Sequence, residues 1–253
     1  VLDGPEEWRG IAAGQFVMVE TAEGLEPYLR RAFSVHDVSK TDRGARIELL
    51  VKIVGPGTRA LAGKRPGERL AVLGPLGQPF GSTAAAGTAD TTDTADSRPV
   101  ALVAGGVGSA PLLLLGRKLL AAGTRFDFYD GGRTRVALVR SAVFERLAQA
   151  SGGSLISTTE DGSAGERGLI TAPLVRRLAA GGYRRIFTCG PMGLMQRLAE
   201  LGAEYGVPGE AALETPMGCG FGACLGCAVE LVDGRFALCC KDGPVFAFDA
   251  VKW

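Results

Sequence analysis

Five of the six cysteines in this 253-residue chain lie close together near its carboxyl end. Cys219, Cys224 and Cys227 follow the pattern C-x4-C-x2-C, and the adjacent pair Cys239–Cys240 comes after them. This spacing, with a fourth and distal cysteine, is the plant-type pattern for a [2Fe–2S] cluster. Glycines within the stretch allow positive φ values and a close approach of the backbone to the cluster: Gly218, Gly220, Gly222 and Gly226. The pattern therefore predicts a loop wrapped around an iron–sulfur cluster.

Zinc and a redox dithiol are the alternatives for these cysteines. Structural zinc sites usually pair two C-x2–4-C knuckles, and only Cys224 and Cys227 have that spacing. A disulfide framework would spread its cysteines through a small secreted domain, so clustered thiols favour a metal site in a reducing, cytoplasmic location. Only one of Cys239 and Cys240 is expected to face the cluster, because adjacent side chains on an extended segment point to opposite faces. The residues themselves leave open which one does.

Composition limits the other classes of function. The formal net charge is +1, so no broad electrostatic field draws the chain toward nucleic acid or anionic lipid. The longest aliphatic run, Leu112–Leu115, is far shorter than the roughly 20 apolar residues of a membrane helix. We therefore expect neither nucleic acid nor a membrane among the partners. The length suits about two domains.

Residues 1–82 are predicted to form an antiparallel β-barrel, because short β segments alternate there with turn signals. The segments are Gln15–Glu20, Arg31–Val38, Arg46–Val54 and Arg69–Leu73. Residues 83–98, rich in Ala, Thr, Asp and Gly, are predicted to be a polar linker. Residues 211–253 carry the cysteine cluster and two short strand-like runs, Ala228–Val232 and Arg235–Leu238, and form a small third unit.

Residues 99–210 alternate between strand and helix patterns, which predicts βαβ units and a parallel sheet. The strands are expected at Pro99–Ala104, Arg125–Tyr129, Ser154–Thr158 and Arg185–Thr188. The helices are expected at Pro111–Leu120, Ser141–Ala150, Thr171–Ala180 and Met192–Tyr205. The fold class is therefore multidomain, a β-barrel followed by an α/β domain and a cluster subdomain.

Two turns of the α/β domain are candidate nucleotide sites. Gly105, Gly106, Gly108 and Ser109 follow an apolar strand and lead into a helix, where backbone amides meet a pyrophosphate. Pro111 stands where a G-x-G-x-x-G motif has its third glycine and suits the first helical turn, so a turn without ligand stays an alternative. Cys189, Gly190 and Pro191 end the last parallel strand, which places Cys189 to touch a ligand. The alternative is that Cys189 is a small buried hydrophobe.

The β domain holds two weaker candidates. In Arg31–Ala32–Phe33–Ser34, the arginine suits a phosphate, Phe33 a ring face and Ser34 a ring nitrogen, although an amphipathic strand is the alternative. Gly55, Gly57 and Thr58 precede a short helix from Arg59 and suit an anion, or simply a turn with Thr58 as N-cap. His36, the one histidine, is expected to be structural.

In this order the motifs resemble the ferredoxin–NADP⁺ reductase-like flavoproteins. Arg31-x-Phe33-Ser34 is similar to their flavin motif, Gly55–Thr58 to their flavin pyrophosphate loop, and Gly74–Gly77 to their inter-domain turn. With Leu213–Glu214, the cysteine loop and Cys240-Lys-Asp-Gly-Pro-Val-Phe246 added, the chain resembles the electron-transfer subunits of NAD-linked dihydroorotate dehydrogenases. The resemblance favours Cys240 as the fourth ligand, with Cys219, Cys224 and Cys227. The family's opening strands are not recognisable before Gln15.

The resemblance implies FAD at Arg31–Ser34 and Gly57–Thr58, and NAD(H) at Gly105–Ser109 and Cys189–Pro191. Ser34 would bond the flavin ring, and Cys189 would shape the nicotinamide pocket. The cluster would lie between FAD and the FMN of a separate catalytic subunit that oxidises dihydroorotate in pyrimidine biosynthesis, within a heterotetramer. NAD versus NADP stays open, since Asp130 suits a ribose hydroxyl and Arg133 a 2′-phosphate; the resemblance favours NAD.

Other partners and one other class remain alternatives. Similar subunits serve NADH-dependent ferredoxin:NADP⁺ oxidoreductases and cytoplasmic hydrogenases. A redox-sensing or iron-binding regulator without turnover would not need the two nucleotide turns. Apolar residues after the cysteines are expected either to join an interface with the catalytic subunit or to pack beneath the cluster: Val245, Phe246, Phe248, Val251 and Trp253.

Overall fold

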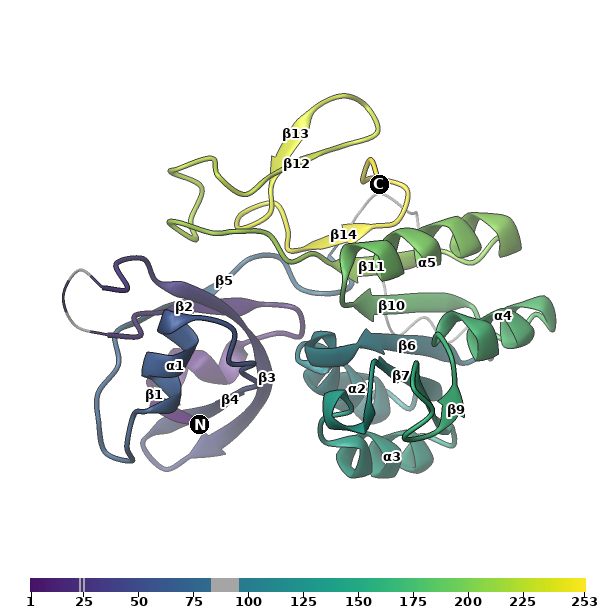
Figure 1. Cartoon of the computed structure of the whole chain (residues 1–253), viewed down its shortest axis with the longest axis horizontal. Coiled ribbons are helices and arrows are strands. Elements are labelled where there is room, and N and C mark those ends of the chain that lie inside the picture. Colours follow the sequence, from purple (N-terminus) through teal and green to yellow (C-terminus); the bar gives the residue numbers. More distant parts are fainter. Residues whose placement is uncertain (23, 25, 83–95) are drawn as a thin grey trace.

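The computed structural model describes residues 1–22, 24, 26–82 and 96–253, and it shows a β domain beside an α/β domain (Figure 1). The cysteine-rich segment lies above the junction of the two domains in this view. The linker predicted at 83–98 lies, over residues 83–95, outside the described residues.

The β domain is a five-stranded antiparallel half-barrel with the order β1-β4-β3-β2-β5. Its strands are β1 (Leu2–Gly4), β2 (Phe16–Val19), β3 (Arg31–Thr41), β4 (Gly44–Leu49) and β5 (Val72–Leu76). Val17, Val19, Val35 and Ile47 point inward and are fully buried, which explains why β-branched residues recur there. The predicted antiparallel fold is confirmed as this half-barrel.

Two local expectations for the β domain were wrong. An opening strand does exist, since β1 pairs with β4 through Leu2 and Ile47, but three residues are too few to show an alternating pattern. Helix α1 (Pro56–Ala62) has Gly55 rather than Thr58 as its N-cap. Proline suits the first helical position because its φ is preset and its missing N–H needs no partner. Thr58 lies further in, and its Oγ1 accepts hydrogen bonds from the amides of Val54 (2.9 Å) and Gly55 (3.1 Å).

The α/β domain contains a seven-stranded sheet with the order β14-β11-β10-β6-β7-β8-β9. The parallel strands are β6 (Val100–Gly105), β7 (Phe126–Gly132), β8 (Leu155–Thr159), β9 (Glu166–Arg167), β10 (Arg185–Cys189) and β11 (Gly209–Ala212). The helices are α2 (Leu112–Ala121), α3 (Ser141–Ala150), α4 (Thr171–Ala179) and α5 (Met192–Tyr205). The predicted βαβ alternation is confirmed, apart from shifts of a few residues at the ends.

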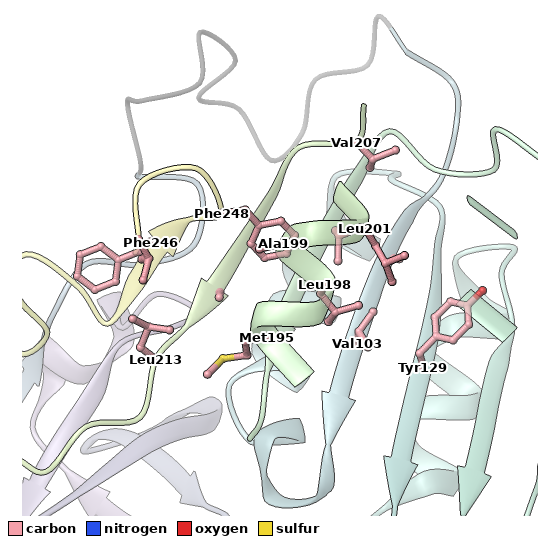
Figure 2. Close-up of a cluster of buried hydrophobic side chains, with 14 of the residues drawn as sticks. Val103, Tyr129, Met195, Leu198, Ala199, Leu201, Val207, Leu213, Phe246 and Phe248 are labelled. Atoms are coloured by element: carbon pink, nitrogen blue, oxygen red, sulfur yellow. The ribbon is translucent and has the colours of Figure 1, made fainter. Parts of the chain in front are cut away.

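Helices cover both faces of this sheet, which is why β6 is apolar at every position. Val100 and Leu102 pack with residues of α2 and α3, whereas Ala101 and Val103 pack with residues of α4 and α5. Figure 2 shows the second core, in which Met195, Leu198 and Leu201 of α5 lie over the sheet beside Val103 and Tyr129.

The carboxyl-terminal segment is joined to the α/β sheet. Residue 211 lies within β11, and β14 (Val245–Ala247) pairs antiparallel with that strand. Between them, β12 (Ala228–Glu230) and β13 (Phe236–Leu238) form a separate hairpin. Sharing a sheet fixes the cysteine segment to the α/β domain.

The apolar tail is core, so the expectation that it supplies a subunit interface was wrong. Its members Val245, Phe246, Phe248 and Val251 are all less than one-tenth exposed. Trp253 is half-buried and donates a hydrogen bond from Nε1 to the carbonyl of Phe248 at 2.7 Å. Phe246 and Phe248 appear in the same core as α5 in Figure 2.

Within the described part of the chain, the helices are too short or too polar to cross a lipid bilayer.

Candidate functional site

A cleft of about 1130 Å³ lies between the half-barrel and the carboxyl ends of the parallel strands. Residues of β3 and of the segment around Lys52 form one wall, called the half-barrel wall here. The turns after β6, β7, β8 and β10, with the strap Leu213–Met217 after β11, form the other, the α/β wall. Ligands of open α/β sheets bind at this edge of the sheet, which makes the cleft the candidate cofactor site.

Most of the predicted cofactor residues line this cleft: Arg31, Ala32, Phe33, Ser34, Thr58, Gly105, Gly106, Gly108, Gly190 and Pro191. Four predicted residues are not part of its lining: Gly55, Gly57, Ser109 and Cys189. Ser109 is fully buried, so its hydroxyl is not presented to the cleft. The cleft is also lined by residues without a predicted role, among them Arg30, Lys52, Thr158, Glu160, Leu169 and Arg197. Folding brings these six together from separate segments, and none belongs to a recognisable motif.

The half-barrel wall is suited to an anion. The Arg31 guanidinium passes over the start of α1, where a Cβ added to Gly57 would lie 2.8 Å from Nε of Arg31. The amides of Gly57 and Thr58 belong to the first helical turn and have no helical carbonyl to bond. A guanidinium beside free amides is the donor set that a pyrophosphate requires, so these residues fit the phosphates of FAD.

On the α/β wall, two turns pack directly against each other. The short 3-10 helix Gly106–Ser109 separates β6 from α2, and Pro111 is the N-cap of α2 rather than part of its first turn. A Cβ on Gly108 would overlap the carbonyl oxygen of Cys189, and one on Gly105 would lie 2.7 Å from Cδ of Pro191. The glycines therefore allow the two strand ends to meet and to present backbone to the cleft, which fits a dinucleotide.

Cys189 lies at the floor of this wall beside Glu214. Its Sγ is 3.8 Å from Oε1 of Glu214. Burial raises the pKa of the Cys189 thiol well above its usual value, and the nearby Glu214 carboxylate raises it further. Burial also raises the pKa of Glu214, whose side chain borders the open cleft while neighbours crowd its carboxyl group. A thiol that stays protonated shapes a pocket and is a poor nucleophile.

The cysteine loop presents thiols and amides to one another. Sγ of Cys219 accepts hydrogen bonds from the amides of Ala223 (3.3 Å) and Cys224 (3.4 Å), and amide hydrogen bonds lower its pKa to about 6. The amide of Cys240 donates to Sγ of Cys227 at 3.4 Å. Burial, and then the adjacent Cys227 thiol, raise the pKa of Cys240 to about 12.

The pair Cys239–Cys240 points two ways, as expected for adjacent residues. Sγ of Cys240 faces Cys227, whereas Sγ of Cys239 is buried against the carbonyl of Leu213 at 3.6 Å. In residues 1–22, 24, 26–82 and 96–253, His, Cys, Asp and Glu side chains form no group of three around a single ion. Four thiolates divided between two irons do not need such a group, so the thiols present fit a [2Fe–2S] cluster.

The cysteine-rich segment contacts the half-barrel at two places. Gly220, with a φ of +85°, lies against the side chain of Met18 in β2. The amide of Gln78, just after β5, donates to the carbonyl of Gly243 at 2.6 Å. Between loop and cleft lies the strap, whose last residue Met217 lines the cleft two positions before Cys219. A flavin in the cleft and a cluster in the loop would therefore be neighbours.

The prediction for His36 is confirmed, whereas the role suggested for Asp130 is not. His36 is structural, as predicted, because its Nδ1 lies 2.7 Å from the carbonyl oxygen of Ala110 and burial lowers its pKa. Asp130, suggested for a ribose hydroxyl, is fully buried and does not line the cleft. It accepts a 3.3 Å hydrogen bond from Oγ of Ser141, and burial raises its pKa to about 7.

Comparison with known families assigns a cofactor domain to each part of the chain. Residues 1–80 match the oxidoreductase FAD-binding domain, and residues 102–200 match the oxidoreductase NAD-binding domain. Residues 214–252 match the iron–sulfur cluster binding domain of dihydroorotate dehydrogenase B. The predicted cofactors FAD, NAD(H) and an iron–sulfur cluster are thereby confirmed at the level of domains.

Relatives and solved structures agree with this assignment. The chain is 34% identical to the electron transfer subunit of dihydroorotate dehydrogenase B (NAD⁺) from Desulforamulus reducens, over 100% of this chain and 91% of that one. It is 32% identical to the subunit of that name from Caldanaerobacter subterraneus, over 95% and 87%. The structure of an NADH-dependent reduced ferredoxin-NADP oxidoreductase aligns with a TM-score of 0.78 and 28% identity, over 97% and 81%. The chain therefore belongs to the family of dihydroorotate dehydrogenase B electron transfer subunits.

Proposed function

We propose that the protein passes electrons from the FMN of a dihydroorotate dehydrogenase catalytic subunit, through a [2Fe–2S] cluster and FAD, to NAD⁺. The observation that carries this proposal is the adjacency of the cleft and the cysteine loop, which the strap Leu213–Met217 joins. Oxidation of dihydroorotate to orotate releases two electrons and two protons. Reduction of NAD⁺ takes up both electrons and one of those protons, and the other proton is released to solvent, so the overall reaction balances.

FAD, when bound, supplies the exchange between two-electron hydride chemistry and one-electron transfer. The residues of this chain position and isolate it. Arg31 and the first turn of α1 hold the phosphates, and Ser34 bonds the ring. Gly105–Gly108 and Gly190–Pro191 hold the nicotinamide nucleotide against the ring, with the neutral thiol of Cys189 buried behind them.

The cluster is assigned to Cys219, Cys224, Cys227 and Cys240. The adjacent cysteines provide a matched pair of variants, because one thiol faces Cys227 and the other faces Leu213. We expect Cys240→Ser to lose most of the iron and acid-labile sulfide, and Cys239→Ala to keep both. Metal analysis and electron paramagnetic resonance of the purified chains measure the two contents. Loss in Cys239→Ala alone would contradict the assignment.

The catalytic subunit is proposed to dock beside the cysteine loop, in a heterotetramer. Phe221 and Leu225 are 59% and 63% exposed, although both are large and apolar, and they flank the exposed Cys224. Isolated apolar side chains are common on surfaces, but two beside a redox site suit a partner. We expect the double variant Phe221→Ser, Leu225→Ser to weaken co-elution with the catalytic subunit. Val136→Ser, which changes an 88% exposed residue of the α/β domain, is the control and should co-elute normally.

The decisive experiment is anaerobic co-purification with the catalytic subunit, followed by an assay of NAD⁺ reduction that depends on dihydroorotate. NADH should bleach both the flavin and the iron–sulfur bands of the chain. A colourless, zinc-loaded protein would contradict the proposal. The six cysteines form no disulfide with one another, which supports a reducing, cytoplasmic location.

A second candidate keeps the cofactors and changes the partner. The structure of the NADH-dependent reduced ferredoxin-NADP oxidoreductase covers 97% of this chain, so a ferredoxin-linked complex is the alternative. Cofactors that NADH reduces, without dihydroorotate-dependent activity or a stable complex, would favour it.

A further inference from the structure

The order of strands indicates which end of the cleft holds the distal half of a dinucleotide. Cys189 and the strap lie at the ends of β10 and β11, at the end of the cleft that leads to the cysteine loop, and the glycine turn follows β6. The next strands in the sheet are β7 and then β8. A dinucleotide with its nicotinamide near Cys189 and its pyrophosphate at the β6 turn must therefore place its adenosine over the ends of β7 and β8.

A carboxylate without a partner lies at this end. Glu160 directly follows β8, is exposed and lines the cleft. Across the described residues, its carboxylate takes part in no hydrogen bond or ion pair. The neighbouring Asp161 differs, because its Oδ1 accepts hydrogen bonds from the amide (2.9 Å) and hydroxyl (2.6 Å) of Ser163.

The backbone of Glu160 is held in place. Its amide donates to the carbonyl of Gly132 at 3.1 Å, which ties the end of β8 to the end of β7. Oγ1 of the preceding Thr159 donates to the carbonyl of Ala164 (2.7 Å) and accepts from its amide (3.0 Å). The turn is therefore built around Thr159, and the Glu160 side chain is free to serve a ligand.

The surroundings suit a nucleoside. Leu169, also in the cleft lining, is 63% exposed although it is large and apolar, as expected of a residue that covers a ring. Thr158 lines the cleft too, is 1% exposed, and its Oγ1 lacks a partner in the described structure. Thr159 lies opposite Arg167 in the parallel β8–β9 pair, so Glu160, the next residue along, lies close to the turn after β9 that carries Leu169.

We propose that Glu160 selects NAD(H) over NADP(H), because its carboxylate accepts the hydroxyls of the adenosine ribose and repels a 2′-phosphate. This inference rests on the proposed function for its ligand, a nicotinamide dinucleotide. Asp130 cannot fill the role, since it is fully buried and does not line the cleft. Arg133 lines the same end of the cleft and attracts phosphate, so Glu160 opposes it. A like charge beside a phosphate discriminates strongly in a cleft.

The test compares NAD⁺ and NADP⁺ binding to the FAD-loaded chain, without any catalytic subunit, by calorimetry. We expect the wild-type chain to bind NAD⁺ more tightly than NADP⁺. In Glu160→Gln, the dissociation constant for NADP⁺ divided by that for NAD⁺ should fall by about tenfold or more. Most of that change should come from tighter NADP⁺ binding, since glutamine keeps a hydrogen-bond acceptor for the ribose.

Two matched variants separate this role from general electrostatics. Asp161→Asn removes the same charge one residue away while keeping an acceptor for Ser163, and Asp130→Asn removes the buried carboxyl. Both should leave the ratio within about twofold of wild type, because neither carboxylate faces the adenosine end of the cleft. An unchanged ratio in Glu160→Gln, or an equal change in Asp161→Asn, would overturn the inference. Binding is independent of the partner, so failure of dihydroorotate-dependent activity would refute the proposed function alone.

Discussion

The two walls of the cleft recognise ligands by different means. The half-barrel wall uses side chains, among them Arg31, which extends from a strand whose backbone is already paired, and Arg30 and Lys52 beside the sheet. Where the ends of β6 and β10 meet, the α/β wall uses backbone, because Gly105, Gly108 and Gly190 leave no room for a side chain between the two strand ends. A wall of side chains should lose affinity gradually on substitution. A wall of close-packed backbone should lose most of its affinity when a single methyl group is added.

Gly108→Ala is the largest expected effect and tests the backbone wall. The new Cβ would overlap the carbonyl oxygen of Cys189, so one of the two turns must move. Overpacking of this kind costs about 1–3 kcal/mol, and we expect NADH-driven flavin reduction to slow by about 100-fold. Stopped-flow absorbance measures it. In the control Gly10→Ala, no atom of the described residues lies within 4 Å of the new Cβ, and an equal loss there would contradict the comparison.

Arg31→Ala tests the side-chain wall and should have the next largest effect. Removing a charge-assisted contact to phosphate weakens FAD binding by about tenfold or somewhat more. Flavin content after desalting, and titration of the apoprotein with FAD, measure the loss. The folded chain should remain otherwise intact, and added FAD should restore NADH oxidation. Arg43→Ala, in the exposed turn between β3 and β4, should retain flavin.

Asp130, a buried residue of the α/β domain, makes the free energy of unfolding of the chain depend on pH. Burial raises its folded-state pKa from 3.8 to about 7, so between these pH values the folded chain keeps a proton that the unfolded chain has released. Stability should therefore fall as pH rises from about 4 to about 7, by at most about 1.4 kcal/mol per pH unit, and then level off. Urea unfolding across this range should show a shallower fall for Asp130→Asn. If the unfolding free energy fell equally steeply with pH in both chains, burial would not raise the pKa of Asp130.

Arg117→Gln should have the smallest effect and concerns the contact between the two domains. Its guanidinium lies 2.8 Å from Oδ2 of Asp37 and is 51% exposed. Such a pair contributes less than about 1 kcal/mol, and salt screens it. Urea unfolding at low and high ionic strength should show a small loss that shrinks with salt. A large, salt-independent loss would mean that this ion pair, rather than apolar packing, holds the two domains together.

Local patterns were sufficient for most of the architecture. An apolar run such as Val100–Ala104 predicts a strand covered on both faces, and alternation of strands with helices predicts a parallel sheet. The cofactor motifs could also be recognised, since glycines at strand ends and the cysteine spacing are short-range features. The three-residue strand β1 escaped recognition because it has no pattern of its own and forms only through its partner β4.

Sequence by itself determined the fold class, the three kinds of cofactor domain and the candidate ligands, because each depends on residues that are close in the chain. Only the tertiary structure decided which carboxylate faces the cleft: Asp130 is enclosed beside Ser141, whereas Glu160 lines the cleft and has no partner among the described residues. It also turned Cys240 toward Cys227 and buried the tail beneath α5. These outcomes depend on contacts between residues far apart in the chain, where burial and the position of the neighbouring strand, rather than residue type, determine what a side chain meets.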